Sequence, residues 1–232
     1  MNRTEFDKFA DEYRATLARS IAASGEEPEF FAKYNVQDVA RLLRARNAPT
    51  LALRILDFGS GTGSSVPFFR ELMPDAELTC VDVSLRSLEL GSSRFAGGAH
   101  FVAFDGRRLP FRDESFDCAF ASCVFHHIPA DAHVPLIAEL KRVLKATGLL
   151  VIFEHNPLNP LTVRTVRACP FDDNAVLIIA RSLRGRVRRA GFISASVSYR
   201  VFFPHQLHGL RPFERALRWL PLGAQYSVVA RK

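Results

Sequence analysis

An apolar segment that ends in an acid and leads into alternating glycines constrains this chain more than any other stretch. Residues 53–57 are mostly aliphatic and end in Asp, and glycines occupy the first, third and fifth positions of residues 59–63. Glycine accepts a positive φ and has no Cβ to hold a ligand away from the backbone. Ser64 or Ser65 can cap a following helix, and Pro67 suits its first turn. The stretch predicts a buried strand, a tight turn and a helix N-terminus, a corner at which nucleotide-like ligands bind.

The spacing of the glycines narrows the class of ligand. A dinucleotide fingerprint, G-x-G-x-x-G, needs a glycine where Ser64 stands, and a phosphate-binding P-loop needs a lysine that this turn lacks. The sequence present is Asp-x-Gly-x-Gly-x-Gly, which resembles the first motif of class I methyltransferases that use S-adenosylmethionine (SAM). The resemblance implies that Asp57 faces the ammonium of SAM, directly or through water. It also places three residues at the cofactor: Gly59, Ser60 and Gly61. A tight turn without a ligand is the alternative.

A second strand-like segment ends in an acid 25 positions beyond Asp57. Residues 76–84 form this segment, with Asp82 near its end and Val83 beside it. A carboxylate at a strand end suits the two hydroxyls of a ribose, which it can accept in bidentate fashion. The pairing of Asp82 with the upstream glycine turn is the most specific signal in the chain. It assigns Asp82 and Val83 to the cofactor site.

Two further segments fit the same family resemblance. A third strand, residues 100–104, ends at Asp105 and Gly106, and Leu-Pro-Phe and Phe-Asp sequences follow it. The resemblance implies that the acid meets the adenine amino group, whereas a plain Asp-Gly turn is the alternative. A fourth strand, residues 118–125, is predominantly apolar, which indicates burial on both faces. Cys123 within it is expected at the cofactor.

The N-terminal residues 1–46 are expected to form a helical lid ahead of a Rossmann-like domain over residues 47–232. A Phe-Asp-x-x-Ala-x-x-Tyr pattern that ends at Tyr13 resembles the cap of many small-molecule methyltransferases. In that family the tyrosine closes over the methionine end of SAM; packing of Tyr13 in a core is the alternative. Substrate-side loops are expected at residues 154–172 and 202–222.

Strand-like and helix-like segments alternate through the chain, which predicts a mostly parallel sheet with helices on both faces. An apolar stripe predicts a helix over residues 130–145 that is capped at Gly148. The family resemblance implies a doubly wound α/β sheet of seven strands, six parallel and the last antiparallel. Ligands bind at the carboxyl ends of such strands, so the acids that end the first three strands are expected around one pocket.

Four side chains near the fourth and fifth strand ends can act as bases: His126, His127, Glu154 and His155. Transfer of a methyl group from a sulfonium is an in-line displacement, and a base helps when the nucleophile is a hydroxyl. Strand alternation puts Glu154 and His155 on opposite faces, so at most one faces the pocket. Histidine titrates near neutral pH, which favours His127 or His155 over Glu154 as the catalytic group. The alternative is that these groups position substrate or hold the loop.

The acceptor is expected to be a small molecule. Enzymes that methylate amino groups of nucleic-acid bases or glutamine carry Asn/Asp-Pro-Pro-Tyr/Phe after the fourth strand, where residues 122–125 read Ser-Cys-Val-Phe. A hydroxyl on a glycan, lipid-linked or secondary-metabolite substrate is the predicted target, with S-adenosylhomocysteine as the second product. The alternatives are a methyltransferase of RNA or protein, a SAM-binding protein without catalysis, and an oxidoreductase, against which the missing third glycine argues.

Composition is that of a globular protein, and we expect it in the cytoplasm. Of the 232 residues, 48% are hydrophobic and 24% are charged. The N-terminus lacks the apolar core of a signal peptide, and no apolar run is long enough to span a bilayer. The four cysteines show no metal-ligand spacing, so we expect reduced thiols and no metal site.

Charge is distributed unevenly. From residue 160 onward, 13 Lys and Arg stand against three acids, whereas the preceding part has 18 against 21. The basic final third indicates an anionic partner, which can be a phosphorylated or carboxylated substrate, a lipid headgroup or nucleic acid, with arginines on solvated helix faces as the alternative. Because a small-molecule acceptor is expected, nucleic acid is not the predicted partner. Within it, residues 202–222 mix apolar side chains with Arg211, Arg215 and Arg218. Three explanations stay open for this segment: a cover for the substrate pocket, a contact with an anionic membrane, and a homodimer contact.

Overall fold

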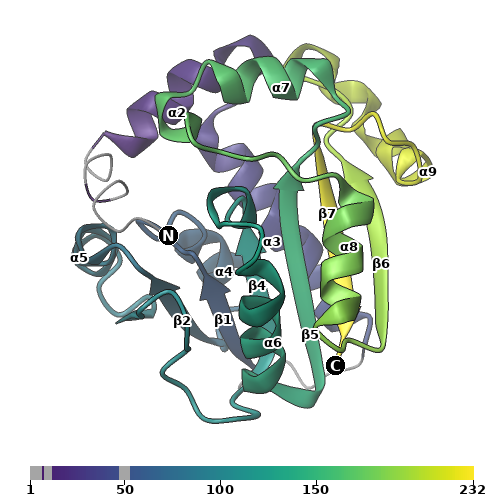
Figure 1. Ribbon diagram of the computed structural model, residues 1–232. Helices are drawn as coiled ribbons and strands as arrows, with labels where there is room; N and C mark the ends of the chain where they lie inside the picture. Colours follow the sequence, from purple (N-terminus) through teal and green to yellow (C-terminus); the bar gives the residue numbers. More distant parts are fainter. Residues whose placement is uncertain (1–6, 8–11, 47–52) are drawn as a thin grey trace.

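The computed structural model describes residue 7 and residues 12–46 and 53–232, which form a seven-stranded sheet covered by helices (Figure 1). The strands are β1 (Arg54–Phe58), β2 (Glu77–Asp82), β3 (His100–Ala103), β4 (Phe116–Ser122), β5 (Leu144–His155), β6 (Ser194–Arg200) and β7 (Gln225–Arg231). Their order in the sheet is β3-β2-β1-β4-β5-β7-β6. Neighbours from β3 to β5 are parallel, and β7 is antiparallel to both β5 and β6. The predicted doubly wound sheet of six parallel strands and one antiparallel strand is confirmed.

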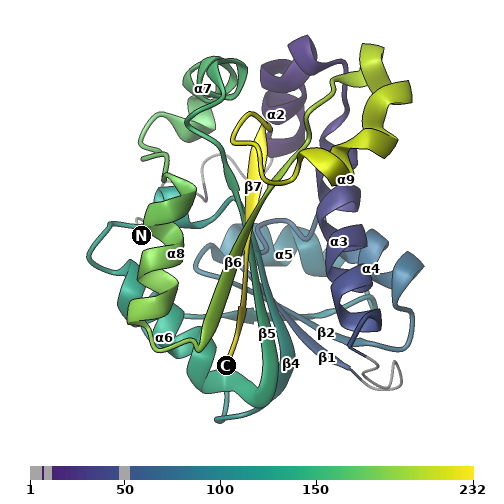
Figure 2. The same ribbon diagram turned by 90° about the vertical axis from the view of Figure 1, so that its right-hand side faces the viewer.

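Helices on the two faces of the sheet enclose two cores (Figure 2). The helices that cover the sheet are α3 (Pro28–Arg44), α4 (Val66–Leu72), α5 (Leu85–Arg94), α6 (His133–Val143) and α8 (Ala180–Arg189). Helices α3 and α4 lie on one face, and α6 and α8 lie on the other. Successive strand residues point to opposite cores, so Ile55 of β1 packs with α3 and α4, and Leu56 packs with α6 and α8.

Helix α3 shows how the sequence sets these layers. Pro28 opens the helix, where its missing N–H costs little, and arginines in the last turn complement the helix dipole. Val36 and Val39 recur at helical spacing and are fully buried in the core beneath the sheet. Asp38 of the same helix is also buried, and it forms a 2.5 Å ion pair with Arg200 of β6. The helix is therefore part of the layered core.

Shorter helical segments lie near the carboxyl ends of the strands (Figure 1). They are α2 (Tyr13–Ile21), η1 (Ala22–Ser24), η2 (Phe125–His127), α7 (Pro160–Arg167), η3 (Pro170–Asp172), η4 (His205–Phe213) and α9 (Glu214–Leu217). Helix α2 packs against α7 and η3. Tyr13 begins α2, but its side chain lies outside the described residues, as do Phe6 and Ala10 of the predicted cap pattern. The division into lid and domain stays a prediction.

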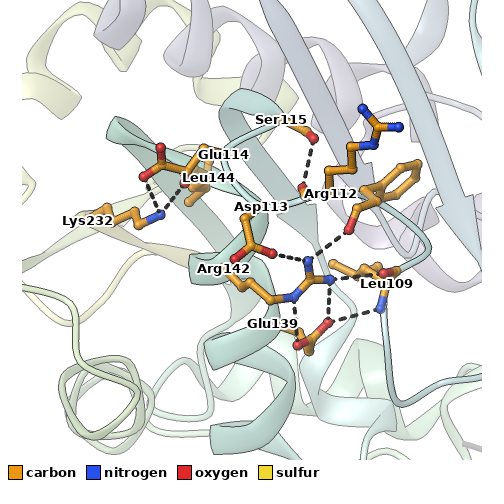
Figure 3. Close-up of polar contacts among 10 residues, drawn as sticks. Leu109, Arg112, Asp113, Glu114, Ser115, Glu139, Arg142, Leu144 and Lys232 are labelled. Carbon is orange, nitrogen blue, oxygen red and sulfur yellow. Dashed lines mark hydrogen bonds and ion pairs between the residues drawn. The ribbon is translucent and has the colours of Figure 1, made fainter.

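Arg142 near the end of α6 holds the loop that follows β3 (Figure 3). Its guanidinium donates to the carbonyl oxygens of Leu109 and Phe111 at 3.0 and 2.8 Å. It also donates to the Asp113 carboxylate at 2.7 Å and to both Glu139 oxygens at 2.8 and 3.0 Å. The five bonds match the five donors of the group. The Leu-Pro-Phe sequence in this loop is thereby fixed to α6.

Gly148 does not cap α6, contrary to the prediction. The helix stops at Val143, and β5 begins at Leu144, whose backbone is extended. Leu144 pairs with Phe116 of β4, and the register then shifts before the regular ladder resumes. A Cβ on Gly148 would lie 2.9 Å from the Leu144 side chain, so this irregular turn of the strand requires glycine.

Residues 202–222 pack against α3 through their polar side chains. The Arg211 guanidinium donates to the Glu26 carboxylate and lies 4.3 Å from the centre of the Phe30 ring. Several apolar side chains of the segment face outward instead: Leu207, Leu210, Phe213, Trp219 and Leu222. The segment is thus anchored on one side and leaves an exposed apolar surface on the other.

Candidate functional site

A cavity of about 520 Å³ lies at the carboxyl ends of the central strands. Its volume is typical of sites for small molecules. At one end lie the glycine turn, Asp57 and Asp82, and the lining also includes Cys123, His127 and His155. Side chains of α2 and α7 complete it. The strand ends therefore bring most of the predicted site residues to one cavity.

The glycine turn serves both the packing of the strands and the cavity. Gly59 and Gly61 have φ values of +73° and +52°, in the region that favours glycine. The Gly59 N–H donates to the Val81 carbonyl at 2.8 Å, and a Cβ on Gly59 would lie 2.6 Å from the Val124 side chain. A Cβ on Gly61 would meet no atom within 4 Å. Gly59 is thus required for packing, whereas Gly61 leaves space for a ligand to approach the backbone.

Asp57, at the end of the glycine-turn strand, is buried and accepts a hydrogen bond from the Ser65 hydroxyl. Burial raises the pKa of the Asp57 carboxyl to about 7, the Ser65 hydrogen bond opposes the rise, and the nearby Asp82 adds to it. Asp57 also lines the cavity. A cationic group in the cavity would therefore stabilise its ionised form.

Asp82 holds the glycine turn against the next helix. Its Oδ2 accepts the Gly61 N–H and its Oδ1 accepts the Ser84 N–H, both at 2.9 Å. The Ser84 hydroxyl caps α5 by accepting the Ser87 N–H at 3.1 Å, and it donates to Asp7 at 2.6 Å. Burial raises the pKa of Asp82, whereas the two backbone donors lower it. Each carboxylate oxygen keeps a second lone pair, so the group can still accept hydroxyls of a ligand.

Three predicted cofactor residues lie apart from the cavity lining: Val83, Asp105 and Gly106. Asp105 is exposed, and its Oδ1 accepts the N–H groups of Arg108 and Arg107 at 2.8 Å each. These backbone bonds lower the pKa of the Asp105 carboxyl. These bonds form the local Asp-Gly turn that was the alternative interpretation of Asp105. Contact of Val83, Asp105 and Gly106 with the cofactor stays a prediction.

Within the part of the chain that the structure describes, two cavity-lining oxygens are buried and have no hydrogen-bond partner, Ser60 Oγ and Gln225 Oε1. Gln225 begins β7 and donates its Nε2 to the Cys123 sulfur at 3.7 Å. Cys123 directly follows β4 and has a φ of +57°, which turns the chain beside the cavity. Buried polar atoms are normally paired, so these oxygens indicate where a ligand would donate hydrogen bonds. No pattern in the sequence marked Gln225.

Glu154 points into the protein and is fully bonded there. Its Oε1 accepts the N–H groups of Val124 and Phe125 at 3.1 and 2.7 Å. Its Oε2 accepts a 2.6 Å hydrogen bond from Nδ1 of His126. Burial alone would raise the pKa of Glu154, but His126 holds it below the usual value. The carboxylate is therefore placed to orient His126, and a direct catalytic role for Glu154 stays a prediction.

His127 and His155 line the cavity as neutral imidazoles. Burial lowers the pKa of His155 to about 4, and it also lowers that of His127. A neutral imidazole near neutral pH can accept a proton from a substrate. His126 differs, because Glu154 and Asp172 raise its pKa to about 9 in spite of its burial.

Asp172 completes this cluster, and no pattern in the sequence marked it. It lies in η3, 45 residues after His127. Its Oδ1 is 3.3 Å from Nε2 of His127 and 3.5 Å from Nε2 of His126. The neighbouring Phe171 packs edge-on against the His127 ring, with the ring centres 5.1 Å apart. Only the folded chain brings these segments together.

Comparison with known proteins shows what the part of the chain around this site is similar to. Residues 56–152 match the family model described as a methyltransferase domain. The chain is 35% identical over 106 residues to a demethylmenaquinone methyltransferase from Thermotoga maritima, an alignment that covers 46% of this chain and 45% of that protein. It is 31% identical over 143 residues to a malonyl-[acyl-carrier protein] O-methyltransferase from Marinomonas sp., covering 60% and 51%. Residues 56–152 therefore form a methyltransferase domain.

The fold is shared over nearly the whole chain with a solved structure. A SAM-dependent methyltransferase from Thermotoga maritima is 22% identical, with a TM-score of 0.67 over 99% of each chain. The chain spans about half the length of the demethylmenaquinone methyltransferase and of the malonyl-[acyl-carrier protein] O-methyltransferase.

SAM is the cofactor of SAM-dependent methyltransferases, and the cavity at the glycine turn fits it. Asp57 and Asp82 offer carboxylates to an ammonium and a ribose, and Gly61 leaves room beside the backbone. The unpaired oxygen of Ser60 is a further acceptor for the hydrogen-bond donors of SAM.

Proposed function

We propose that this methyltransferase moves a methyl group from SAM to a small-molecule acceptor inside the cavity. One observation carries the proposal: the carboxylates beside the glycine turn and the imidazoles of His127 and His155 line the same cavity. Asp57 would bind the ammonium of SAM, and Asp82 would bind its ribose. The imidazoles would then lie on the acceptor side.

A hydroxyl is the acceptor group that this arrangement suits best. Methyl transfer from the sulfonium requires the acceptor oxygen, the methyl carbon and the sulfur in line, so the protein's task is alignment in a dry cavity. A neutral His127 or His155 can take the hydroxyl proton as the oxygen–carbon bond forms. We therefore propose O-methylation of a glycan, lipid-linked or secondary-metabolite substrate.

The lining disfavours the other candidate functions. Two carboxylates beside the glycine turn would repel the pyrophosphate of a dinucleotide, which argues against an oxidoreductase. Apolar side chains such as Leu17, Phe31 and Phe202 line much of the cavity, which supports a small acceptor over RNA or protein.

Ligand-induced thermal stabilisation tests the cofactor, and labelled transfer tests the reaction. SAM and S-adenosylhomocysteine should raise the melting temperature, and NAD should not. Incubation with SAM carrying a deuterated methyl group and a metabolite extract should then label a small molecule, and NMR of the product separates O-methyl from C-methyl groups. Stabilisation by NAD alone, or SAM binding without transfer to any extract, would contradict the proposal.

We also propose that residues 202–222 contact an anionic membrane surface. Phe202 and Pro204 line the cavity, so this segment forms part of its wall. Its outward side carries apolar side chains, of which Trp219 is the most exposed at 74%. An exposed apolar surface of this kind is typical of an interaction site.

The loop before α7 extends this surface. Asn159 donates to the Leu222 carbonyl at 2.7 Å, which places the loop beside the segment. Leu158 of the loop and Leu161 of α7 are exposed, and Arg164 of α7 is an exposed cation close to them in sequence. Apolar and basic side chains together suit a surface with anionic lipid headgroups. No described helix is long and apolar enough to cross a membrane, so the proposed contact is peripheral.

A further inference from the structure

Two imidazoles converge on one carboxylate oxygen beside the cavity at distances that are long for hydrogen bonds. Nε2 of His127 and Nε2 of His126 lie 3.3 and 3.5 Å from Oδ1 of Asp172. Hydrogen bonds from nitrogen to oxygen usually span about 2.7–3.2 Å. In the same cluster, Nδ1 of His126 and Oε2 of Glu154 are only 2.6 Å apart, so the packing here allows shorter contacts.

We propose that His126, His127 and Asp172 form a binding site for a divalent transition-metal ion such as zinc. Each residue offers one ligand atom, and the three atoms all lie within 4.8 Å of one another. Bonds of about 2.0–2.2 Å at tetrahedral angles place neighbouring ligand atoms about 3.3–3.5 Å apart. Both contacts to Asp172 already have this separation. Bringing the two imidazole nitrogens closer together would complete a three-ligand site.

Glu154 supplies the support that such a site requires. Its Oε2 accepts the Nδ1–H of His126, and its Oε1 is fixed by the N–H groups of Val124 and Phe125. This bond engages Nδ1 of His126, so Nε2 is the ring nitrogen that faces Asp172, and an ion that binds there would displace its proton. A carboxylate behind a histidine ligand is the usual outer partner in metal sites. Glu154 is thus a positioning residue for the proposed ligand His126.

A bound ion would act on the acceptor of the methyl group, so this inference rests on the proposed function. His127 and Phe171 line the cavity, so the ion's remaining coordination positions would face it. Two nitrogens and one oxygen suit zinc, cobalt or iron(II) and do not suit magnesium, which prefers oxygen ligands. A hydroxyl bound to the ion loses its proton more easily. With His127 as a ligand, His155 would accept that proton while the oxygen takes the methyl group and the sulfonium becomes a neutral thioether.

Calorimetry on the full chain, freed of metal with a chelator, tests the proposal. Zinc should bind at one ion per chain, magnesium should give no heat, and cobalt should produce a visible absorption band of low coordination number. Asp172→Asn keeps the shape of the side chain and should weaken zinc binding by about tenfold or more. Zinc should also raise the melting temperature of the wild type and not that of Asp172→Asn.

The matched control removes a surface histidine pair that could bind zinc adventitiously. His205 and His208 have ring centres 5.6 Å apart on η4, and the His205→Ala/His208→Ala double variant should bind zinc as the wild type does. Loss of binding in this control, or equal binding by wild type and Asp172→Asn, would overturn the proposal. His127→Gln repeats the test if Asp172→Asn does not fold.

SAM calorimetry on the metal-free chain separates this inference from the proposed function. If the chain binds SAM but binds no zinc, the metal proposal is overturned and the proposed function stands. Zinc binding at the cluster without SAM binding would overturn the proposed function instead.

Discussion

The Tyr34 hydroxyl donates a 2.7 Å hydrogen bond to Oε2 of Glu214 and so joins α3 to a segment 180 residues later in the chain. Oε1 of the same carboxylate accepts the N–H groups of Phe202 and Phe203 at 2.8 and 3.2 Å. Glu214 is buried, and burial together with this carboxylate raises the pKa of Tyr34. Because Phe202 lines the cavity, this one hydrogen-bonded unit sets the position of a cavity wall.

Tyr34→Phe should destabilise the protein and disturb the acceptor side. Loss of a buried hydrogen bond to a charged group costs about 1.5–3 kcal/mol in the free energy of unfolding, measurable by urea denaturation. The Michaelis constant for a verified acceptor should rise, whereas SAM affinity should be nearly unchanged. Tyr199→Phe is the matched control, since Tyr199 contacts Tyr226 through its ring. Equal effects of the two substitutions would show that the Tyr34 hydrogen bond contributes nothing specific.

Asp82→Ala should weaken SAM binding by about 2–4 kcal/mol, measured by calorimetry. The substitution removes the proposed ribose acceptor and also frees the backbone N–H groups of Gly61 and Ser84. Asp105→Ala is a comparison at an exposed carboxylate outside the cavity lining, where a smaller loss is expected. Unchanged SAM affinity in Asp82→Ala would remove the ribose assignment.

Asp57 should make both stability and SAM binding depend on pH. Its carboxyl has a pKa of about 7 when folded and 3.8 ordinarily, so between these values the unfolded chain releases a proton that the folded chain retains. The free energy of unfolding should therefore fall as pH rises from about 4 to about 7. Asp57→Asn should melt above the wild type at alkaline pH, and this difference should vanish toward pH 4.

Asp57→Asn should weaken SAM binding even though it stabilises the folded protein at alkaline pH. SAM affinity of the wild type should increase as pH rises through about 7, because the ammonium binds the ionised carboxylate. Asp57→Asn should bind SAM weakly and lose this pH dependence. A wild-type affinity that is flat across neutral pH would mean that the ammonium does not meet Asp57.

His127→Asn and His155→Asn should each lower turnover of a verified acceptor and leave SAM affinity nearly intact. Their proposed roles lie in the transition state, so the loss should appear in kcat. Single-turnover rates and SAM calorimetry on the same preparations separate the two effects. Wild-type rates in both variants would show that neither imidazole takes part in the transfer.

Liposome co-sedimentation tests the proposed membrane surface. Binding should require anionic lipid, weaken as salt increases, and fall in a Trp219→Ser/Leu222→Ser variant. Light scattering of the same protein distinguishes a homodimer contact, which would bury the same side chains. No binding to anionic vesicles at low salt would leave the segment as a cavity wall alone.

Local patterns explain why much of the fold could be predicted from the sequence. Asp57 and Asp82 each follow a mostly apolar stretch, and the glycine spacing that follows Asp57 fixes a specific turn, so their placement needs no distant contact. The irregular start of β5 could not be predicted, because Gly148 depends on the pairing of Leu144 with β4.

The imidazole end of the site depends on contacts that no local pattern shows. No sequence pattern around Asp172 marks it as a site residue. It reaches the imidazoles only because η3 lies beside η2 in the fold. Gln225 reaches the cavity because β7 runs antiparallel and so begins at the carboxyl end of β5. The exposure of Asp105 could not be predicted either. Asp105 lies near the end of its strand as Asp82 does, yet Asp82 is buried and Asp105 is exposed.

The antiparallel insertion of β7 also has a consequence for synthesis on the ribosome. The edge of β5 that β7 covers stays unpaired until residue 225 is made, 70 residues after β5 ends, and β6 pairs with β7 and cannot cover it. That edge is a run of buried apolar residues from Leu149 to Phe153. An unpaired apolar edge invites pairing with other chains. Nascent chains that stall before β7 should therefore aggregate, and productive folding of the second half should depend on chaperones that shield this strand.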